Sequence, residues 1–300
     1  MAVYLTEQDV ERLLRPADGV EAVEASFRRL AAGTARNRPR YRIPFAGGTL
    51  QVMAAVDEEA GLAGSKTYAV AGGEMSVIVS LFSIASGKLA GVIEANKLGQ
   101  LRTGGASAVA ARHLARPGAS SLGVIGCGRQ AESQVACIRE TIPSIERVVA
   151  YCRTEHSLRA FCQRVHAEAG DSNQAAAEQD IVVTVTSSRD PVLRGEWLRE
   201  GALVCAVGAN HPSRRELDNV ALERAAFVCC DSLEQAQLES ADLIEPVETG
   251  ALDWLEVHEL QEVVSGELPG RQAEADIVVF KSNGLAAWDV ALGAVALGRA

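Results

Sequence analysis

The stretch GVIGCGRQAESQ, residues 123–134, decides the fold of this 300-residue chain. Gly126, Gly128 and Ala131 match the pattern G-x-G-x-x-G/A, directly after an apolar run and at the opening of a helical pattern. Glycines at these positions let the backbone turn tightly and approach a pyrophosphate, whose charge is met by free N–H groups at the start of the helix. The stretch therefore predicts a dinucleotide-binding turn, which also includes Arg129 and Gln130.

The sequence that follows this turn alternates apolar runs with helical patterns. Such alternation is typical of an α/β fold with a Rossmann-type, doubly wound parallel sheet that is buried on both faces. We place this domain at residues 116–280. The runs predicted to be strands are SLGVIG (121–126), RVVAYCR (147–153), DIVVTVTSS (180–188), ALVCAVGA (202–209), FVCCDS (227–232) and IVVF (277–280).

Residues 1–115 predict a smaller α+β domain. TEQDVERLL (6–14) opens with a Thr cap and VEAVEASFRRLAAG (20–33) ends at a glycine, so both predict helices. Short runs of branched residues then predict an antiparallel meander, with a hairpin turn at ASGK (85–88). GGASAVAARHLA (104–115) predicts a further helix, and residues 281–300 predict a helix that returns to this domain.

Composition excludes several classes of function. The formal charge of -10 repels nucleic acid and anionic membranes, so we expect a small-molecule partner. No apolar run approaches the roughly 20 residues that span a bilayer, and no signal peptide is recognisable, which favours the cytoplasm. Seven scattered cysteines indicate reduced core thiols, and the dispersed histidines and cysteines lack zinc-site spacing, so we expect no metal.

The end of the second predicted strand bears on the choice of dinucleotide. An Asp or Glu there binds the ribose hydroxyls of NAD, but Cys152, Arg153 and Thr154 occupy the place here. The Arg153 guanidinium suits a 2′-phosphate and Thr154 offers a hydroxyl, so the sequence favours NADP(H) over NAD(H). Two alternatives stay open: Arg153 is a solvated surface residue, or the strand ends later and Glu155 serves NAD.

Five motifs resemble the ornithine cyclodeaminase and mu-crystallin family, in order and over most of the chain. The resemblance implies an N-terminal domain that forms a homodimer and binds a small amino or imino acid, beside a Rossmann domain that holds NAD(P). Members include ornithine cyclodeaminase, dehydrogenases of alanine and arginine, and reductases of cyclic ketimines. The motifs are AGVIEANKLGQLRTGGA (90–106), GCGRQA (126–131), VGANHPSRRELD (207–218), GELPGR (266–271) and VFKSNGLAAWD (279–289).

Three cations lie within otherwise apolar segments of the first domain, where an unpaired charge is costly to bury. They are Arg42, Lys66 and Arg102. The resemblance assigns Arg42 and Arg102 to the substrate carboxylate, which the planar fork of arginine suits. It assigns Lys66 to catalysis beside the substrate nitrogen, where a desolvated lysine can exchange a proton near neutral pH. The alternative for each is a solvated or salt-bridged side chain.

Other positions are assigned to the cofactor with less specific signals. Thr103 lies at the predicted start of a helix, where its hydroxyl and N–H would meet a phosphate or ribose, or would only cap the helix. Thr186 and Ser187 follow the third Rossmann strand, and Ser282 follows the last one; each resembles a family position beside the dinucleotide, or caps a turn. Val207, which ends the fourth strand, is assigned to the same site.

One departure from the family pattern separates its members. Ornithine cyclodeaminases carry an Asp where this chain reads GAN, with Asn210, and an amide cannot accept a proton as a carboxylate does. We therefore expect an NADPH-dependent reductase that transfers hydride to the carbon of a cyclic ketimine carboxylate, with Lys66, or a water that Lys66 orients, supplying or stabilising the proton on nitrogen. The alternatives are ornithine cyclodeaminase, an open-chain amino-acid dehydrogenase, and a protein that binds these ligands without turnover.

Overall fold

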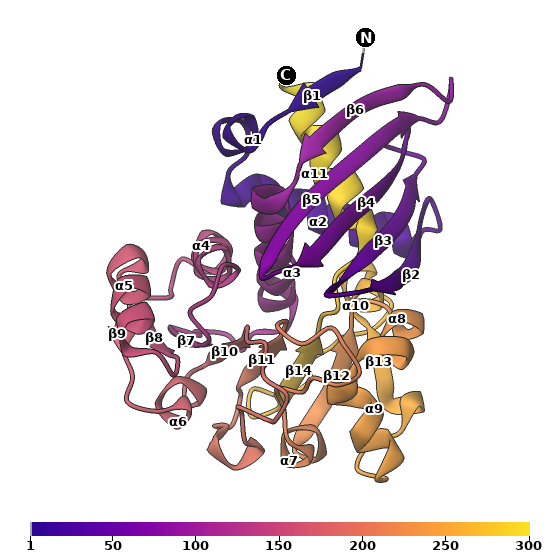
Figure 1. Cartoon of the computed structure of the whole chain (residues 1–300). Coiled ribbons are helices and arrows are strands. Elements are labelled where there is room, and N and C mark those ends of the chain that lie inside the picture. Colours follow the sequence, from indigo (N-terminus) through magenta and orange to yellow (C-terminus); the bar gives the residue numbers. More distant parts are fainter. Residues whose placement is uncertain (1) are drawn as a thin grey trace. The chain divides into compact units, whose positions relative to one another are not determined.

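The computed structural model describes residues 2–300, which form two compact units (Figure 1). The first unit contains the residues up to Gly105 together with Leu285–Ala300, and the second contains Ala106–Gly284. The division falls within one helix, α3 (Asn96–Leu114). Within the described residues, no helix combines the length and apolar character that crossing a membrane requires.

A six-stranded sheet in the order β1-β6-β5-β4-β3-β2 forms the centre of the first unit. Strands β2 to β6 pair antiparallel in sequence order, which confirms the predicted meander. The predicted hairpin turn is also present, since the N–H of Gly87 donates to the carbonyl of Ser83 at 2.8 Å. Strand β1 pairs parallel with β6 and was not predicted. The strands are β1 (Val3–Leu5), β2 (Ala35–Phe45), β3 (Gly48–Asp57), β4 (Leu62–Ala71), β5 (Glu74–Ser83) and β6 (Leu89–Glu94).

Helices cover one face of this sheet. Helix α11 (Ala286–Gly298) packs on strands β2 to β5 and on α2 (Pro16–Ala31), behind the sheet in the view of Figure 1. Close packing depends on glycine, because a Cβ on Gly64 would lie 2.9 Å from Val290 of α11. The short helix α1 (Glu7–Leu13) begins with Thr6 as its cap, as predicted.

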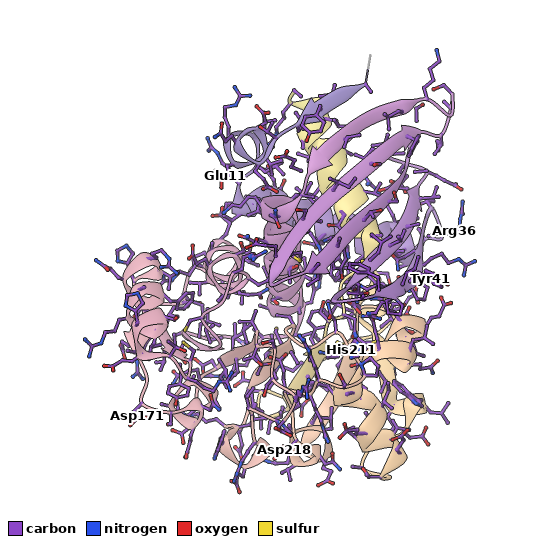
Figure 2. All side chains as sticks on the ribbon, viewed as in Figure 1. Glu11, Arg36, Tyr41, Asp171, His211 and Asp218 are labelled. Carbon is purple, nitrogen blue, oxygen red and sulfur yellow. The ribbon has the colours of Figure 1, made fainter. Side chains whose placement is uncertain are left out.

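The opposite face of the sheet carries apolar side chains in solvent. Tyr41 is 67% exposed and lies on β2 at this face (Figure 2). The alternation of side chains along a strand places Ile43 and Phe45 on the same face as Tyr41. Large apolar side chains exposed on one face of a sheet mark an interaction surface. Its exposed large residues on β2 and β5 are Tyr41, Ile43, Phe45, Ile78 and Phe82.

Helix α3 begins at Asn96, earlier than the predicted start at Gly104, and this part of the prediction was wrong. Gly105, which lay at the predicted start, serves helix packing inside α3. A Cβ on Gly105 would lie 2.5 Å from the carbonyl oxygen of Gly19 on α2, and a Cβ on Gly19 would lie 2.8 Å from the carbonyl of Leu101. Two glycines facing each other therefore let α2 and α3 approach closely.

The second unit contains a parallel eight-stranded sheet in the order β13-β12-β14-β11-β10-β7-β8-β9. All six predicted strands are present, which confirms the Rossmann-type fold. The short edge strands β9 and β13 were not predicted, nor was the place of β14 between β11 and β12. The strands are β7 (Ser121–Ile125), β8 (Arg147–Tyr151), β9 (Glu168–Ala169), β10 (Ile181–Thr184), β11 (Leu203–Ala206), β12 (Ala225–Cys230), β13 (Val257–Glu259) and β14 (Ile277–Lys281).

The chain reverses its direction of travel across the sheet at β7, from which β8 and β9 extend one way and β10 and β11 the other. In open α/β sheets, ligands bind beyond the carboxyl ends of the strands at such a point. The glycine-rich turn leaves β7 at this edge. The helices of the unit are α4 (Ala131–Thr141), α5 (Glu155–Val165), α6 (Asn173–Ala177), α7 (Asn219–Glu223), α8 (Leu233–Glu239), α9 (Ala241–Glu248) and α10 (Leu260–Ser265), with 3-10 turns at Gly195–Trp197 and Trp254–Glu256.

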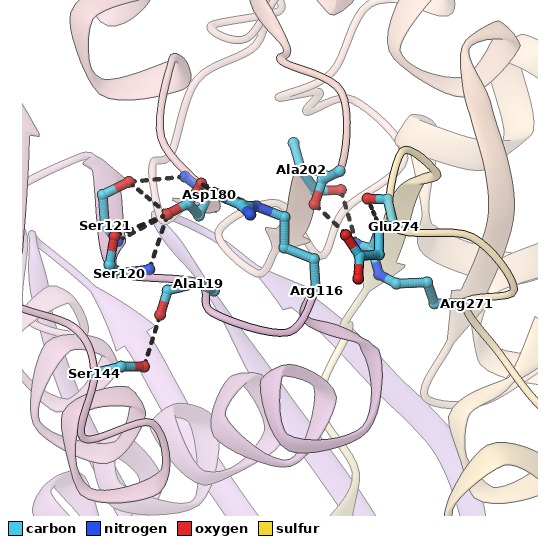
Figure 3. Close-up of polar contacts among 10 residues, drawn as sticks. Arg116, Ala119, Ser120, Ser121, Ser144, Asp180, Ala202, Arg271 and Glu274 are labelled. Carbon is cyan, nitrogen blue, oxygen red and sulfur yellow. Dashed lines mark hydrogen bonds and ion pairs between the residues drawn. The ribbon is translucent and has the colours of Figure 1, made fainter.

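The amino-terminal edge of the same sheet is held by charged side chains (Figure 3). Asp180, just before β10, accepts hydrogen bonds from the backbone N–H groups of Ser120 and Ser121, just before β7, and from the Arg116 guanidinium at 2.6 Å. Arg271 donates to the carbonyl of Gly201 at 3.0 Å, ahead of β11. These contacts satisfy backbone groups where the strands begin, which leaves the opposite edge available for a ligand.

Candidate functional site

Lys66, Arg102 and Asp289 meet in the interior of the first unit. The Lys66 Nζ lies 3.0 Å from Oδ1 of Asp289, and the Arg102 Nε lies 3.3 Å from the same oxygen. All three side chains are buried, and they come from β4, α3 and α11. Two cations thus share one carboxylate oxygen. The structure brings together two of the three predicted substrate-site cations and adds an acid that was not predicted.

The local sequence explains why Lys66 points inward. On β4 its neighbours across the sheet are Met53 and Val79, both buried, so Lys66 lies on the face covered by α11. Gly99 of α3 leaves space for the ammonium group, because a Cβ there would lie 3.3 Å from the Nζ atom. A side chain at that position would force the lysine to shift by a few tenths of an ångström.

This environment lowers the pKa of Lys66 to about 8. Burial is the largest cause, because it penalises the charged ammonium. The positive charges of Arg102 and Arg40 lower the pKa further, whereas the charge and hydrogen bond of Asp289 raise it. An amine with this pKa is mostly protonated at pH 7 and can still release its proton, which suits it to acid–base chemistry.

Arg40 and Arg42 reach the same face of the sheet from β2. The pairing of β2 with β3 shifts between Arg38 and Tyr41, so one extra residue is accommodated there and Arg40 is buried. Arg42 is half-buried and pairs across the strands with Gln51. Sequence analysis identified Arg42 and missed Arg40, because a shift in strand register leaves no signal in a single sequence.

Thr103 does not lie at the start of a helix, so that prediction was wrong. It lies within α3, and its Oγ1 donates to the carbonyl of Gly99 at 2.7 Å. An interior residue of an α-helix uses its N–H in the helix and has none to offer a phosphate. Its assignment to the cofactor therefore depends on the remaining hydroxyl lone pairs alone.

The glycine-rich turn of the second unit has the geometry that an anion requires. Gly126 has a φ of 111°, and a Cβ there would lie 2.6 Å from the carbonyl of Val185. A Cβ on Gly128 would meet nothing within 4 Å, so the backbone is open to close approach. Helix α4 begins at the buried Ala131, whose N–H donates to the carbonyl of Gly128 at 3.1 Å. Gln130 makes no side-chain cap, which leaves the N–H groups that follow in the first turn for a ligand.

The strand after this helix ends where the ribose was expected. Strand β8 ends at Tyr151, and Cys152, Arg153 and Thr154 follow, with Arg153 and Thr154 exposed. Glu155 is the first residue of α5 and forms an ion pair with Arg159. The condition under which Glu155 would serve NAD, a later end of the strand, is therefore not met.

A buried carboxylate braces the two loops that follow β10 and β11. Glu216 accepts hydrogen bonds from the N–H of Thr186 at 2.6 Å and from its hydroxyl at 2.8 Å. It also accepts from the N–H groups of Gly208 at 2.7 Å and Ala209 at 3.0 Å. Because Ser188 donates to the Thr186 hydroxyl in turn, Thr186 has a bracing role in addition to its predicted place beside the cofactor.

A second pair of charges closes this network. Asp242 accepts from the N–H of Glu216 at 2.7 Å and lies 2.9 Å from the ammonium of Lys281, at the end of β14. Lys281 donates to the carbonyl of Ala209 at 2.5 Å. Loops from three strands are thus tied together, and Asn210 follows directly on the tied residue. Buried polar groups satisfied in this way hold a single conformation.

The remaining predicted positions lie at the same edge of the sheet. Val207 continues β11, since its N–H donates to the carbonyl of Thr184 at 2.9 Å, and Ser187 follows Thr186 after β10. The Ser282 hydroxyl donates to the buried carboxylate of Asp231 at 2.9 Å. These residues are therefore near the ends of the strands, where the fold places ligands.

Comparison with known proteins identifies the family. The sequence profile of the ornithine cyclodeaminase/mu-crystallin family matches residues 2–297. The chain belongs to this family. The family resemblance carried by the five motifs is thereby confirmed.

Relatives within the ornithine cyclodeaminase/mu-crystallin family differ in activity. The chain is 34% identical to an alanine dehydrogenase of Archaeoglobus fulgidus, over 98% of this chain and 93% of the relative. It is 37% identical to a Δ1-pyrroline-2-carboxylate reductase of Bacillus cereus, over 71% and 67%. It is 34% identical to the ketimine reductase mu-crystallin of Mus musculus, over 76% and 70%.

Solved structures of the family share the whole fold. The Δ1-pyrroline-2-carboxylate reductase of Thermococcus litoralis, in complex with NADH and L-proline, has a TM-score of 0.94 at 28% identity and covers 99% of this chain and 97% of its own. An archaeal alanine dehydrogenase dimer with bound NAD has a TM-score of 0.93 at 33% identity, over 99% and 95%. The fold prediction is confirmed.

Asp289 is the main functional candidate that sequence reasoning missed. It lay within a quoted motif, VFKSNGLAAWD, but was given no role. A signal was present, because the predicted helix around Asp289 is otherwise apolar. Charged residues are rarely buried unless they are paired. An acid in an apolar helix pattern therefore predicts a buried partner, although the pattern does not identify which residue that partner is.

Proposed function

We propose that the protein is an NADPH-dependent reductase of a small imino acid, specifically a cyclic ketimine carboxylate such as pyrroline- or piperideine-2-carboxylate. One observation carries the proposal: the buried cluster in which Lys66 and Arg102 share the carboxylate of Asp289. A guanidinium suits a substrate carboxylate, and an amine with a pKa of about 8 suits proton transfer. Relatives that reduce pyrroline-2-carboxylate and ketimines support imino acids as the substrate class.

Reduction of an imine requires a hydride at carbon and a proton at nitrogen. Bound NADPH would supply the hydride, from C4 of its nicotinamide ring. Arg42 and Arg102 would bind the substrate carboxylate and so fix the orientation of the imine carbon. The Lys66 ammonium, held in place by Asp289, would donate its proton to the imine nitrogen. Burial of the cluster would limit competition from water.

The residues of the second unit suit a dinucleotide. The open backbone at Gly128 and the uncapped start of α4 provide N–H groups for a pyrophosphate. Arg153 and Thr154, both exposed after β8, would bind a ribose 2′-phosphate. Residues 151–154, at the end of β8 and just after it, include no Asp or Glu that would bind the ribose hydroxyls of NAD. We therefore propose NADP(H) over NAD(H), although the solved relatives carry NADH or NAD.

Reduction is favoured over cyclodeamination by Asn210. This residue occupies the place of the family's acid, in the loop after β11. An amide cannot take up a proton from the substrate amine or from water. Net reduction of an imine needs no residue that accepts a proton, because its single proton transfer is from Lys66 to the imine nitrogen.

A homodimer is proposed through the exposed apolar face of the first unit. The face includes Tyr41, Ile43 and Phe45 on β2, and exposed faces of this kind usually bind another protein. The alanine dehydrogenase relative described above is a dimer. An Ile43→Asp variant should be monomeric by light scattering, because burying the new carboxylate between apolar faces is costly. A wild-type monomer would contradict the proposal.

The test of function is turnover with defined substrates. NADPH and NADH oxidation would be followed with cyclic and open-chain imino acids, and ornithine with catalytic NAD would be assayed for ammonia. Turnover of a cyclic ketimine with NADPH preferred is the expected result. Ammonia from ornithine would show a cyclodeaminase, and net NAD(P)H formation with an amino acid would show a dehydrogenase.

Two lysine variants separate catalysis from binding. Lys66→Ala should lose turnover and keep NADPH binding, because the proton donor is removed and the glycine-rich turn is untouched. Lys88→Ala is the matched control, since Lys88 is exposed in the hairpin turn between β5 and β6. Full turnover by Lys66→Ala would remove this lysine from the mechanism.

A further inference from the structure

Two of the seven cysteines are not core thiols, contrary to the sequence prediction. Cys127 and Cys152 are half-buried, whereas the other five are buried. Cys127 lies between Gly126 and Gly128 of the glycine-rich turn. Cys152 lies where the ribose of the dinucleotide is expected. Neither thiol has a role in the proposed reaction.

The fold brings these two thiols into contact. Strands β7 and β8 are neighbours, and the N–H of Gly126 donates to the carbonyl of Tyr151 at 2.8 Å. Cys127 directly follows Gly126 and Cys152 directly follows Tyr151, so each cysteine is next to one partner of this backbone hydrogen bond, and their thiols are hydrogen-bonded to each other. Disulfides need Cα atoms about 4.4–6.8 Å apart, and the backbone hydrogen bond at Gly126 holds the two chain segments at the spacing of adjacent strands, about 4.7–4.9 Å.

We propose that Cys127 and Cys152 form a reversible disulfide that closes the cofactor site under oxidising conditions. This proposal rests on the proposed function, because the turn matters only if a dinucleotide binds there. Bonding to Cys152 would pull the side chain of Cys127 toward β8 and distort the turn between the two glycines. The turn would then lose the conformation that presents its N–H groups to a pyrophosphate.

The oxidant is hydrogen peroxide, and the reaction proceeds in two steps. The Cys152 thiolate attacks the peroxide, which forms a sulfenic acid and releases water after protonation. The sulfur of Cys127 then attacks that sulfenic sulfur, the S–S bond forms, and a second water leaves. Two thiols lose two electrons and the peroxide gains them. A dithiol reverses the change by thiol–disulfide exchange.

The order of attack follows from the surroundings of each thiol. Burial and the hydrogen bond to Cys152 raise the pKa of Cys127, so it remains protonated at neutral pH. The thiolate is the nucleophile, and Cys127 therefore acts second. Disulfide formation should accelerate as the pH rises.

Trypsin separates the relevant cysteines, which makes the bond directly measurable. Cleavage after arginine places Cys127 in peptide 113–129, Cys152 in 148–153 and Cys162 in 160–164. Purified protein would be treated with hydrogen peroxide, digested without reduction and examined by mass spectrometry. We expect peptide 113–129 linked to 148–153, and saturating NADPH should slow its formation because the ligand holds the turn in its reduced form.

Cofactor binding is measured on the same samples. Oxidation of the wild type should raise the Kd for NADPH by about tenfold or more, and dithiothreitol should restore it. In Cys127→Ser, the Kd before and after peroxide should agree. Cys162→Ser is the matched control, because Cys162 lies on α5 near both thiols, and this variant should respond like the wild type.

Three results would overturn the proposal. One is the absence of the 127–152 link after peroxide treatment. Another is a link that forms without changing the Kd. The third is loss of the response in Cys162→Ser, which would assign the bond to another pair. If the reduced wild type binds neither NADPH nor NADH, the proposed function fails together with the effect on binding, while the linked peptide still establishes the disulfide.

Discussion

Replacing Asp289 with Asn tests the electrostatic account of the buried cluster. The substitution keeps the shape of the side chain and removes its negative charge. Lys66 then retains burial and the positive charge of Arg102, both of which lower its pKa, and loses the partner that raises it. The pKa of Lys66 should therefore fall further below its ordinary value.

The size of the fall follows from the geometry. An opposite charge within about 4–6 Å moves a pKa by about 1–3 units, and Asp289 lies 3.0 Å from the Lys66 Nζ. The pKa of Lys66, which is about 8 in the wild type, should drop to about 5–7 in Asp289→Asn. At pH 7, the protonated fraction would fall from about 90% to half or less. Imine reduction, which needs the protonated amine, should slow in proportion.

NMR can measure this pKa directly. The chain has only four lysines, Lys66, Lys88, Lys97 and Lys281. Protein labelled with 13C at the lysine ε-carbon therefore gives four side-chain signals, and the signal missing from Lys66→Met assigns Lys66. Its chemical shift would be followed from pH 5 to 11 in the wild type and in Asp289→Asn. The pH at which imine reduction declines should move by the same amount.

Asp57→Asn is the matched control. Asp57 is also a buried acid of the first unit, paired with Arg29 at 2.8 Å, but it lies at the end of β3 opposite Leu62. Both variants remove a buried carboxylate and should lose stability, Asp289→Asn by about 3–5 kcal/mol because its partners are buried too, yet only Asp289→Asn should shift the Lys66 signal. An unchanged titration of Lys66 in Asp289→Asn would refute the reasoning, as would an equal shift in Asp57→Asn.

Four further predictions test other parts of the structure. The pKa of Lys66 is lower in the folded protein than in the unfolded chain, so between these two pKa values the unfolded chain binds more protons and stability rises with pH. From pH 8 to 10.5, the free energy of unfolding of the wild type should rise by roughly 3 kcal/mol relative to that of Lys66→Met. Urea unfolding measures both proteins. Arg153→Ala should raise the KM for NADPH about tenfold or more and leave that for NADH nearly unchanged in steady-state assays; equal changes would contradict the 2′-phosphate role. Gly105→Ala should lose about 1–3 kcal/mol of stability, because the new Cβ would lie 2.5 Å from a backbone oxygen of α2. In Gly298→Ala the new Cβ would meet nothing within 4 Å, so thermal unfolding should show unchanged or higher stability. Glu216→Gln should lose about 1–3 kcal/mol or more of stability, because both carboxylate oxygens accept hydrogen bonds and the new amide N–H₂ would face donors on whichever side it points. Unchanged stability would show that the network contributes little.

Local patterns determined a large part of this molecule. The G-x-G-x-x-A turn, the apolar runs of the parallel sheet and the meander could be predicted because each depends on residues that are neighbours in the sequence. Glycine spacing, side-chain periodicity and caps such as Thr6 act over a single turn or strand. Lys66 and Arg102 could be selected on similar grounds, because a cation within an apolar segment is costly to bury and needs a partner in any fold.

Only the tertiary structure decided which distant residues meet. Asp289 is 223 positions from Lys66, and no periodicity links them. Helix α3 begins at Asn96 because the carboxylate of Glu7, 89 positions away, accepts hydrogen bonds from its first N–H groups, while Gly105 fits against Gly19. A sequence pattern can indicate that a buried charge or a free N–H group needs a partner. Which residue becomes that partner depends on how strands and helices pack in space. The contact between Cys127 and Cys152 likewise depends on the pairing of two strands.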